Sequence, residues 1–141
     1  MESRIEKAVN LFKGGYNCAQ SVFVAYADLF ELDEETALRI SSGFGGGIGG
    51  TRSVCGTVSG MTLVVGLKSG TFTPNDKEGK KKNYADVQLL ISKFQEQHGS
   101  IICKELLGLE NCSIPVNKKP CVEYVRFCAE LIEKKLLKEK E

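Results

Sequence analysis

The chain has 141 residues and a mass of 15.4 kDa, the usual size of one domain with one continuous hydrophobic core. Nineteen Lys and Arg residues against eighteen Asp and Glu residues leave a net charge of +1, which argues against nucleic acid or an anionic membrane as the main partner. A composition of 42% hydrophobic and 26% charged residues is typical of a folded soluble domain and excludes a disordered chain. Fifteen glycines and six cysteines, beside a single histidine, are the unusual features and hold the candidates for function.

The N-terminal segment and the longest apolar stretch bear on the cellular location of the protein. Residues 1–7 alternate charged and apolar side chains and lack the apolar core of a secretory signal. The stretch 54–67 is shorter than the roughly twenty residues of a membrane-spanning helix. We therefore expect a cytoplasmic protein without a membrane partner. In a reducing compartment, six cysteines favour catalytic, redox or metal-binding thiols over a disulfide scaffold.

The spacing of apolar residues predicts a mostly helical chain. The expected helices cover residues 5–12, about 18–30, about 34–42, 75–97, a short segment around 103–107, and a last helix from about 121 to 136. Asn17 and Asp33 are the predicted N-caps of the second and third helices, and Pro120 opens the last one. Gly79 and the lysines at 80–82 predict a frayed start to the long helix.

Two segments depart from plain helical spacing. Residues 43–50 hold so many glycines, each costing about 1 kcal/mol in a helix, that they predict a loop with left-handed or extended positions. Residues 55–67 fit a buried helix or a strand, and the four-residue spacing of Gly56 and Gly60 favours a helix with a smooth packing stripe. A further loop is expected at 109–119. With no repeat or linker visible, we predict one all-α domain over residues 1–141, a bundle of about five to seven helices with a glycine-rich loop.

Four of the six cysteines share one predicted setting, the start of a helix: Cys18, Cys55, Cys103 and Cys121. The free backbone N–H groups and partial positive charge of a helix N-terminus stabilise a thiolate, which makes the cysteine a better nucleophile or metal ligand. Any one of them alone is better interpreted as a small buried hydrophobic residue, but four in the same setting favour the functional interpretation. Cys128 lies on the apolar face of the last helix and is predicted to be core, whereas no role is predicted for Cys112.

Spacing excludes several familiar motifs. The absence of any Cys-x-x-Cys excludes a thioredoxin-like motif, a zinc ribbon and covalent c-type haem. The glycine segment follows a helix and is neither a dinucleotide fingerprint nor a P-loop. Two interpretations of this segment stay open. In the first, Gly45, Gly47 and Arg52 form an anion-binding or cofactor-binding nest. In the second, the segment is a tight turn that brings Cys55 close to other backbone. His98, at a predicted helix end, is interpreted as structural, as a charged helix-end residue, rather than as a base.

Five segments form a specific pattern by their order and spacing. They are Gly15–Gln20, Gly43–Gly47, Cys55–Gly60, Gly99–Gly108 and Pro120–Val122. The pattern resembles a family of redox-active proteins named for its C-GCAxxG-C-C cysteines, whose four characteristic positions correspond to the four helix-start cysteines. Thr57 stands where that family usually has alanine. Members of that family are found in bacteria and archaea, so the resemblance implies such a source. Some members carry selenocysteine in place of a cysteine, which implies thiol redox chemistry. The resemblance implies no particular substrate.

The leading hypothesis is a thiol-dependent oxidoreductase that works by thiol–disulfide exchange. Cys55 would be the attacking thiolate, activated by its helix N-terminus and Arg52, and Cys18 its resolving partner, with Cys103 and Cys121 converging nearby. The partner would be a redox protein or a small thiol or disulfide.

Two other classes of function compete with this hypothesis. The same four thiols have the number and type of ligands for an Fe–S cluster or Zn²⁺, which would make the protein an electron carrier or give it a structural metal. A third class is a non-catalytic ligand or partner module that uses the glycine loop and Arg52. Apolar helix faces are compatible with a homodimer but do not require one.

Overall fold

Helices dominate the computed structural model, which describes residues 2–109 and 119–138. The helices are α1 (Ile5–Lys13), α2 (Cys18–Ala27), α3 (Glu34–Ser42), α4 (Gly45–Ile48), α5 (Gly56–Ser69), α6 (Lys77–His98), α7 (Cys103–Leu106) and α8 (Cys121–Leu131). A 3₁₀ turn, η1 (Asp28–Phe30), extends α2, and a π-helical turn, η2 (Ile132–Leu136), extends α8. Within the described ranges there is no strand, only an isolated antiparallel bridge between Val54 and Ile102. The predicted all-α single domain is confirmed.

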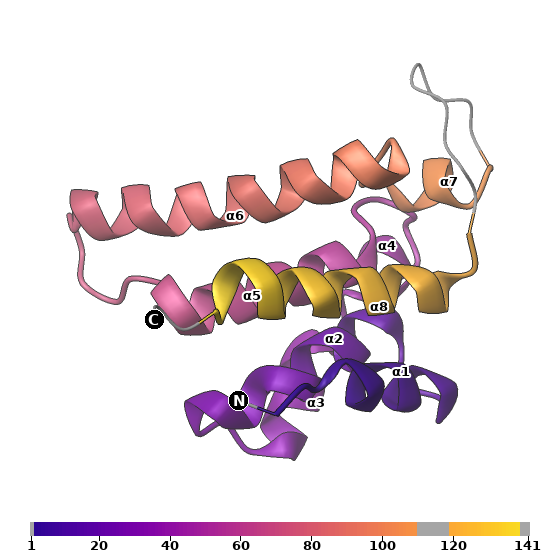
Figure 1. The fold of residues 1–141 in the computed structure, drawn as a ribbon, viewed down its shortest axis with the longest axis horizontal. Helices are drawn as coiled ribbons and strands as arrows, with labels where there is room; N and C mark the ends of the chain where they lie inside the picture. Colours follow the sequence, from indigo (N-terminus) through magenta and orange to yellow (C-terminus); the bar gives the residue numbers. More distant parts are fainter. Residues whose placement is uncertain (1, 110–118, 139–141) are drawn as a thin grey trace.

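The centre of the fold is α2. Eight of its ten residues are buried, and α5 packs along it more extensively than any other helix does. Figure 1 shows α1, α2 and α3 on one side of the molecule, α5 and α8 in the middle, and the long α6 on the opposite side. The described part of the chain contains no helix that is both long and apolar enough to cross a membrane.

The caps predicted from the sequence set where α2 and α3 begin. The Asn17 side chain accepts a hydrogen bond from the Gln20 backbone N–H at 2.9 Å, and the Gln20 side chain accepts one from the Asn17 N–H at 3.1 Å. This reciprocal capping box satisfies two N–H groups that the helix leaves free. Asp33 caps α3 by accepting from the Thr36 N–H at 2.9 Å. Because the cap fixes the first turn of α2, it also fixes the position of Cys18, the first residue of that helix.

Residues 56–69 form a helix rather than a strand, and the reason is the contact with α2. A Cβ atom at Gly60 would lie only 2.7 Å from the Ala19 carbonyl oxygen, so the two backbones touch there. At Gly56, a Cβ atom would lie 2.6 Å from the Cys18 sulfur. The four-residue glycine spacing thus serves close helix packing, as the sequence indicates.

Two elements differ from the sequence expectation in detail. The long helix is already regular at Lys77, because the Asp76 side chain accepts a hydrogen bond from the Gly79 N–H at 2.9 Å and caps the start that was expected to fray. The second helix was expected to continue to about residue 30, but its α-helical part ends at Ala27. The remaining residues, Asp28–Phe30, form the 3₁₀ turn η1. Most of the loop expected at 109–119 lies outside the described residues.

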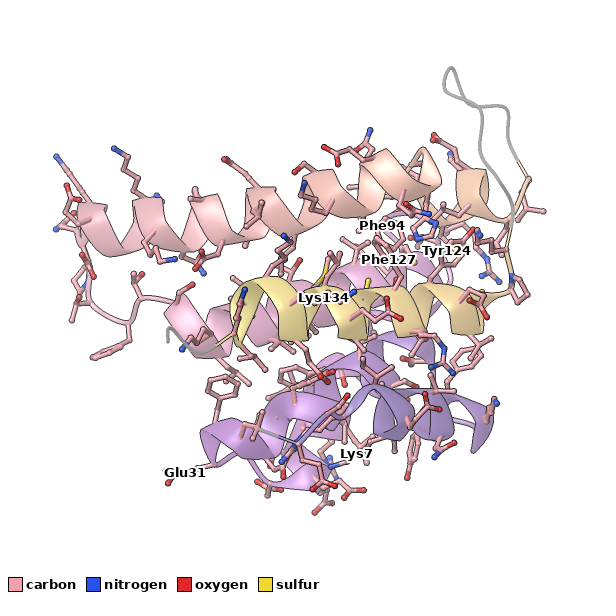
Figure 2. The ribbon with its side chains drawn as sticks, viewed as in Figure 1. Lys7, Glu31, Phe94, Tyr124, Phe127 and Lys134 are labelled. Carbon is pink, nitrogen blue, oxygen red and sulfur yellow. The ribbon has the colours of Figure 1, made fainter. Side chains whose placement is uncertain are left out.

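An aromatic cluster joins α6 to α8. Figure 2 shows Phe94, Tyr124 and Phe127 gathered between these two helices. The His98 ring lies among them, with ring centroids 4.6 to 4.8 Å away, and is only 3% exposed. Burial, with Lys119 nearby, lowers the pKa of His98, so the ring is neutral at pH 7. His98 is therefore a core side chain, and the expectation of a charged helix-end histidine is wrong.

A pair of glycine substitutions in α5 tests the helix contact. We expect Gly60→Ala to lower the free energy of unfolding by about 1–3 kcal/mol, because the methyl group must displace the backbone of α2. The control, Gly66→Ala in the same helix, meets no atom within 4 Å and should raise stability by up to about 1 kcal/mol. Urea unfolding followed by circular dichroism measures both changes, and equal effects of the two variants would contradict the close contact.

Candidate functional site

The four predicted cysteines all begin helices, and all face one cavity. Cys18, Cys103 and Cys121 are the first residues of α2, α7 and α8, and Cys55 is the N-cap of α5. Together with Arg52 they line a cavity of about 80 Å³. Figure 1 shows α4 and α7 side by side at the end of the molecule where α8 begins. The structure therefore brings together residues that are far apart in the sequence.

A short backbone pairing holds two of these cysteines at the cavity. The segments around the isolated bridge run antiparallel, and the Cys55 N–H donates to the Ile101 carbonyl at 2.7 Å. On the other side of the bridge, the Cys103 N–H donates to the Ser53 carbonyl at 2.6 Å. Because both hydrogen bonds are between backbone groups, they position Cys55 and Cys103 without involving their thiols.

The glycine loop works as a tight turn that packs against the thiols. Gly46 and Gly47 adopt left-handed conformations with φ of 64° and 67°, as the sequence predicts for this segment. The Gly46 backbone hydrogen-bonds the Cys18 thiol, and a Cβ atom at Gly47 would lie 2.7 Å from the Cβ of Cys103. The loop carbonyls of Gly46 and Gly47 accept from the N–H groups of Arg52 and Ser53. These carbonyl groups are thus engaged in the turn itself. The anion-binding nest expected of Gly45, Gly47 and Arg52 would use N–H groups and stays a prediction.

Arg52 lies at the cavity, but beside a different cysteine from the one expected. Its Nη1 atom lies 3.7 Å from the sulfur of Cys103, the geometry of a hydrogen bond to sulfur. Burial and the neighbouring Cys103 raise the pKa of Cys121, and the positive charge of Arg52 opposes that rise. The expected activation of Cys55 by Arg52 stays a prediction, because the contact found is between the Arg52 guanidinium group and Cys103.

Cys55 is the most buried of the four, with 6% of its surface exposed. Burial raises the pKa of its thiol to about 11, against the effect of a hydrogen bond of 3.0 Å that its sulfur shares with the Thr57 hydroxyl. Cys55 is thus a protonated thiol at neutral pH, which argues against its expected role as the attacking thiolate. Thr57 is itself fully buried and is a direct partner of this thiol.

A fifth thiol, Cys128, adjoins the cluster from the core side. It is fully buried, as predicted, and burial raises its pKa well above the usual 9. It also interacts with Thr57, Cys55 and Cys18, a proximity that the sequence analysis missed. The available signal was the spacing of Cys121 and Cys128, seven residues apart and so on one helix face. All five described cysteines are free thiols, and Cys112 lies outside the described residues.

The thiols also bear on the metal-site hypothesis. Within residues 2–109 and 119–138, no three or more His, Cys, Asp or Glu side chains are placed to hold one metal ion. Cys18, Cys55, Cys103 and Cys121 share the cavity, yet in this arrangement they do not form a tetrahedral ligand set. A metal or cluster would need these side chains to close around it.

The fold and this cavity define a helical protein built around a cluster of cysteines at helix starts. The chain belongs to the family described as "Putative redox-active protein (C_GCAxxG_C_C)", whose model matches residues 16–135. It is similar to an "Uncharacterized protein" of Archaeoglobus fulgidus, with 28% identity over 138 residues that cover 92% of this chain and 91% of that relative. No solved structure matches the chain. The resemblance inferred from the sequence is thus confirmed.

Burial of the thiols predicts a loss of stability in alkali. The unfolded Cys55 thiol ionises near pH 9 and the folded one at about 11, so ionisation favours the unfolded chain between these values. The contribution of the protonated Cys55 thiol to stability is complete below about pH 8 and is lost as the pH rises toward 11. The serine of Cys55→Ser does not ionise in this range. Between pH 8 and pH 10 the free energy of unfolding of this variant should therefore fall by about 1 kcal/mol less than that of the wild type. Urea unfolding of reduced protein measures this, and identical pH profiles would contradict it.

Proposed function

We propose that the cysteine cluster carries out thiol–disulfide exchange, with Cys103 as the attacking thiolate and Cys121 as its resolving partner. The observation that carries the proposal is the position of the Arg52 guanidinium group beside Cys103 in a cavity lined by four free thiols. A positive charge next to a cysteine favours its thiolate, which is the nucleophile in exchange. Membership of a redox-active family is consistent with this chemistry.

The choice of this pair rests on exposure and proximity. Cys103 and Cys121 are both partly exposed, whereas Cys55 is buried. They are also close enough for the charge of one to raise the pKa of the other. A substrate disulfide that arrives from solvent therefore meets these two sulfurs before Cys55.

The reaction conserves atoms and electrons. The Cys103 thiolate attacks one sulfur of the substrate disulfide, forms a mixed disulfide and releases the other half as a thiolate. The Cys121 thiolate then attacks the Cys103 sulfur, forms a Cys103–Cys121 disulfide and releases the remaining half. The two protein thiols are oxidised, the substrate disulfide is reduced to two thiols, and an external dithiol, a redox protein or a small molecule, restores the reduced protein.

Metal binding through Cys18, Cys55, Cys103 and Cys121 is the alternative within the same cavity. It would require the thiols to move closer together than they lie, and the contact of Arg52 with a single sulfur favours a nucleophile instead. A ligand module built on the glycine loop and Arg52 is less favoured, because the Arg52 side chain contacts the Cys103 sulfur.

Substitutions of Arg52 and Cys103 test the proposal. We expect Cys103→Ser to abolish formation of the mixed disulfide with bis(2-hydroxyethyl) disulfide at pH 7. Arg52→Met should slow the reaction about tenfold, the kinetic equivalent of a charge-assisted contact of about 1.4 kcal/mol. Because this disulfide is uncharged, the change reports on the thiolate rather than on attraction of the substrate. The rate is followed by rapid quenching with an alkylating agent and mass spectrometry of the protein.

Arg39→Met is the matched control, because Arg39 is an exposed residue of α3 that pairs with Glu35 away from the cavity. It should react at the wild-type rate. If Arg52→Met also reacted at that rate, or if Cys55→Ser rather than Cys103→Ser abolished the reaction, the assignment of Cys103 would be wrong.

A further inference from the structure

The thiols of the cavity are arranged in order of depth. Arg52 contacts Cys103 and its charge acts on Cys121, and both cysteines are partly exposed, whereas Cys55 is buried. Cys18 lies between them, since it interacts electrostatically with Cys121 on one side and with Cys55 on the other. A single redox pair at the entrance would leave Cys18 and Cys55 without a role.

We propose that the protein holds two redox pairs, an outer pair of Cys103 and Cys121 and an inner pair of Cys18 and Cys55, and that oxidation passes from the outer pair to the inner one. This inference rests on the proposed function and extends it, because the chain would then accept two disulfide equivalents, or four electrons, in place of two. The inner pair is oxidised through the outer pair and not by the substrate.

Exposure supports the separation of the two pairs. Cys55 is 6% exposed, so a substrate disulfide with organic groups on both sulfurs has little access to its thiol. Cys18 is partly exposed, as are Cys103 and Cys121, but burial raises the pKa of its thiol. Cys121 is a neighbour through which oxidation can pass to Cys18, since its charge also raises that pKa.

The transfer inward is a pair of exchange reactions. The Cys18 thiolate attacks the Cys121 sulfur of the outer disulfide, forms a Cys18–Cys121 disulfide and releases the Cys103 thiolate. Cys55 then gives up its proton and attacks the Cys18 sulfur, which forms the Cys18–Cys55 disulfide and releases the Cys121 thiolate. The number of disulfides is unchanged, the outer thiols are restored, and a second substrate disulfide can react with them.

Local contacts equip Cys18 for this central position. The Gly46 backbone hydrogen-bonds its sulfur and favours the thiolate, against the burial that raises its pKa. Gly56 lacks a side chain where a Cβ atom would lie 2.6 Å from that sulfur, so Cys18 reaches the backbone directly after Cys55. The attack of Cys55 on Cys18 is intramolecular, and its high effective concentration offsets the low thiolate fraction of Cys55.

The experiment counts and locates disulfides in the full chain. The protein carries Cys112→Ser, so that the cysteine outside the described residues does not add to the number of thiols. It is reduced and then exposed to excess bis(2-hydroxyethyl) disulfide. Samples are quenched with acid, alkylated in denaturant and mapped by mass spectrometry of their peptides. We expect the Cys103–Cys121 disulfide first, the Cys18–Cys55 disulfide later, and four thiols lost at the end.

Two variants in the same background test the route. Cys121→Ser should leave the inner pair reduced, because it removes the sulfur through which oxidation passes. Cys55→Ser keeps a hydroxyl group beside Thr57 and should stop at two lost thiols, with Cys103–Cys121 as the final disulfide. Circular dichroism confirms that both variants are folded before their disulfides are compared.

The outcomes separate this inference from the proposed function. A Cys103–Cys121 disulfide with the inner thiols still reduced overturns the two-pair arrangement and leaves the proposed function intact. Oxidation of Cys18 and Cys55 at the wild-type rate in Cys121→Ser, or a Cys55–Cys128 disulfide in place of Cys18–Cys55, overturns the inward route. The absence of any protein disulfide or mixed disulfide overturns the proposed function itself.

Discussion

The backbone contact between α2 and α5 is the constraint on which the site depends. At Gly56 and Gly60 a single methyl group would collide with α2, so these helices approach more closely than helices with side chains at that contact can. The contact buries most of α2 and places the start of one helix against the start of the other. Cys18 and Cys55 consequently share a cavity although they are far apart in the chain. The backbone pairing around Val54 and Ile102 then adds Cys103 to the same cavity.

Two electrostatic effects compete at every thiol of the cluster. A helix N-terminus stabilises a thiolate by a fraction of a kcal/mol to about 2 kcal/mol, whereas burial of a charge costs several kcal/mol. At Cys55 burial dominates and the thiol stays protonated. At Cys103 the contact with Arg52 supplies a positive charge at a partly exposed sulfur. Four cysteines in the same kind of helix position therefore differ in depth and in their charged neighbours.

Much of the fold follows from short-range signals in the sequence. The apolar spacing, the caps at Asn17 and Asp33 and the glycine pair in α5 act within one or two helical turns, which is why they predict the helices correctly. They also predict that four cysteines begin helices, because a helix boundary is itself a local feature. The frayed start expected for α6 is not found, since the cap at Asp76 stabilises that turn.

The chemistry of the individual thiols depends on tertiary contacts, which the sequence alone does not contain. Periodicity does not reveal that Arg52 turns toward Cys103, because its direction is set by the left-handed glycine turn and the backbone pairing that follows it. The depth of Cys55 arises only when other helices pack around it, although its hydrogen bond to Thr57, two residues further along, is local. For the same reason, the sequence indicates a cluster of cysteines but does not reveal how their burial and charged neighbours differ.

The most direct test of the thiol account is a visible absorption spectrum with elemental analysis of protein purified without oxygen from metal-replete cells. The account predicts a colourless protein with no stoichiometric iron or zinc, in which the four cavity cysteines react as free thiols. Absorption near 400 nm with about four iron atoms per chain, the composition of a four-cysteine [4Fe–4S] site, would contradict it. About one zinc ion per chain held by the same cysteines would contradict it as well.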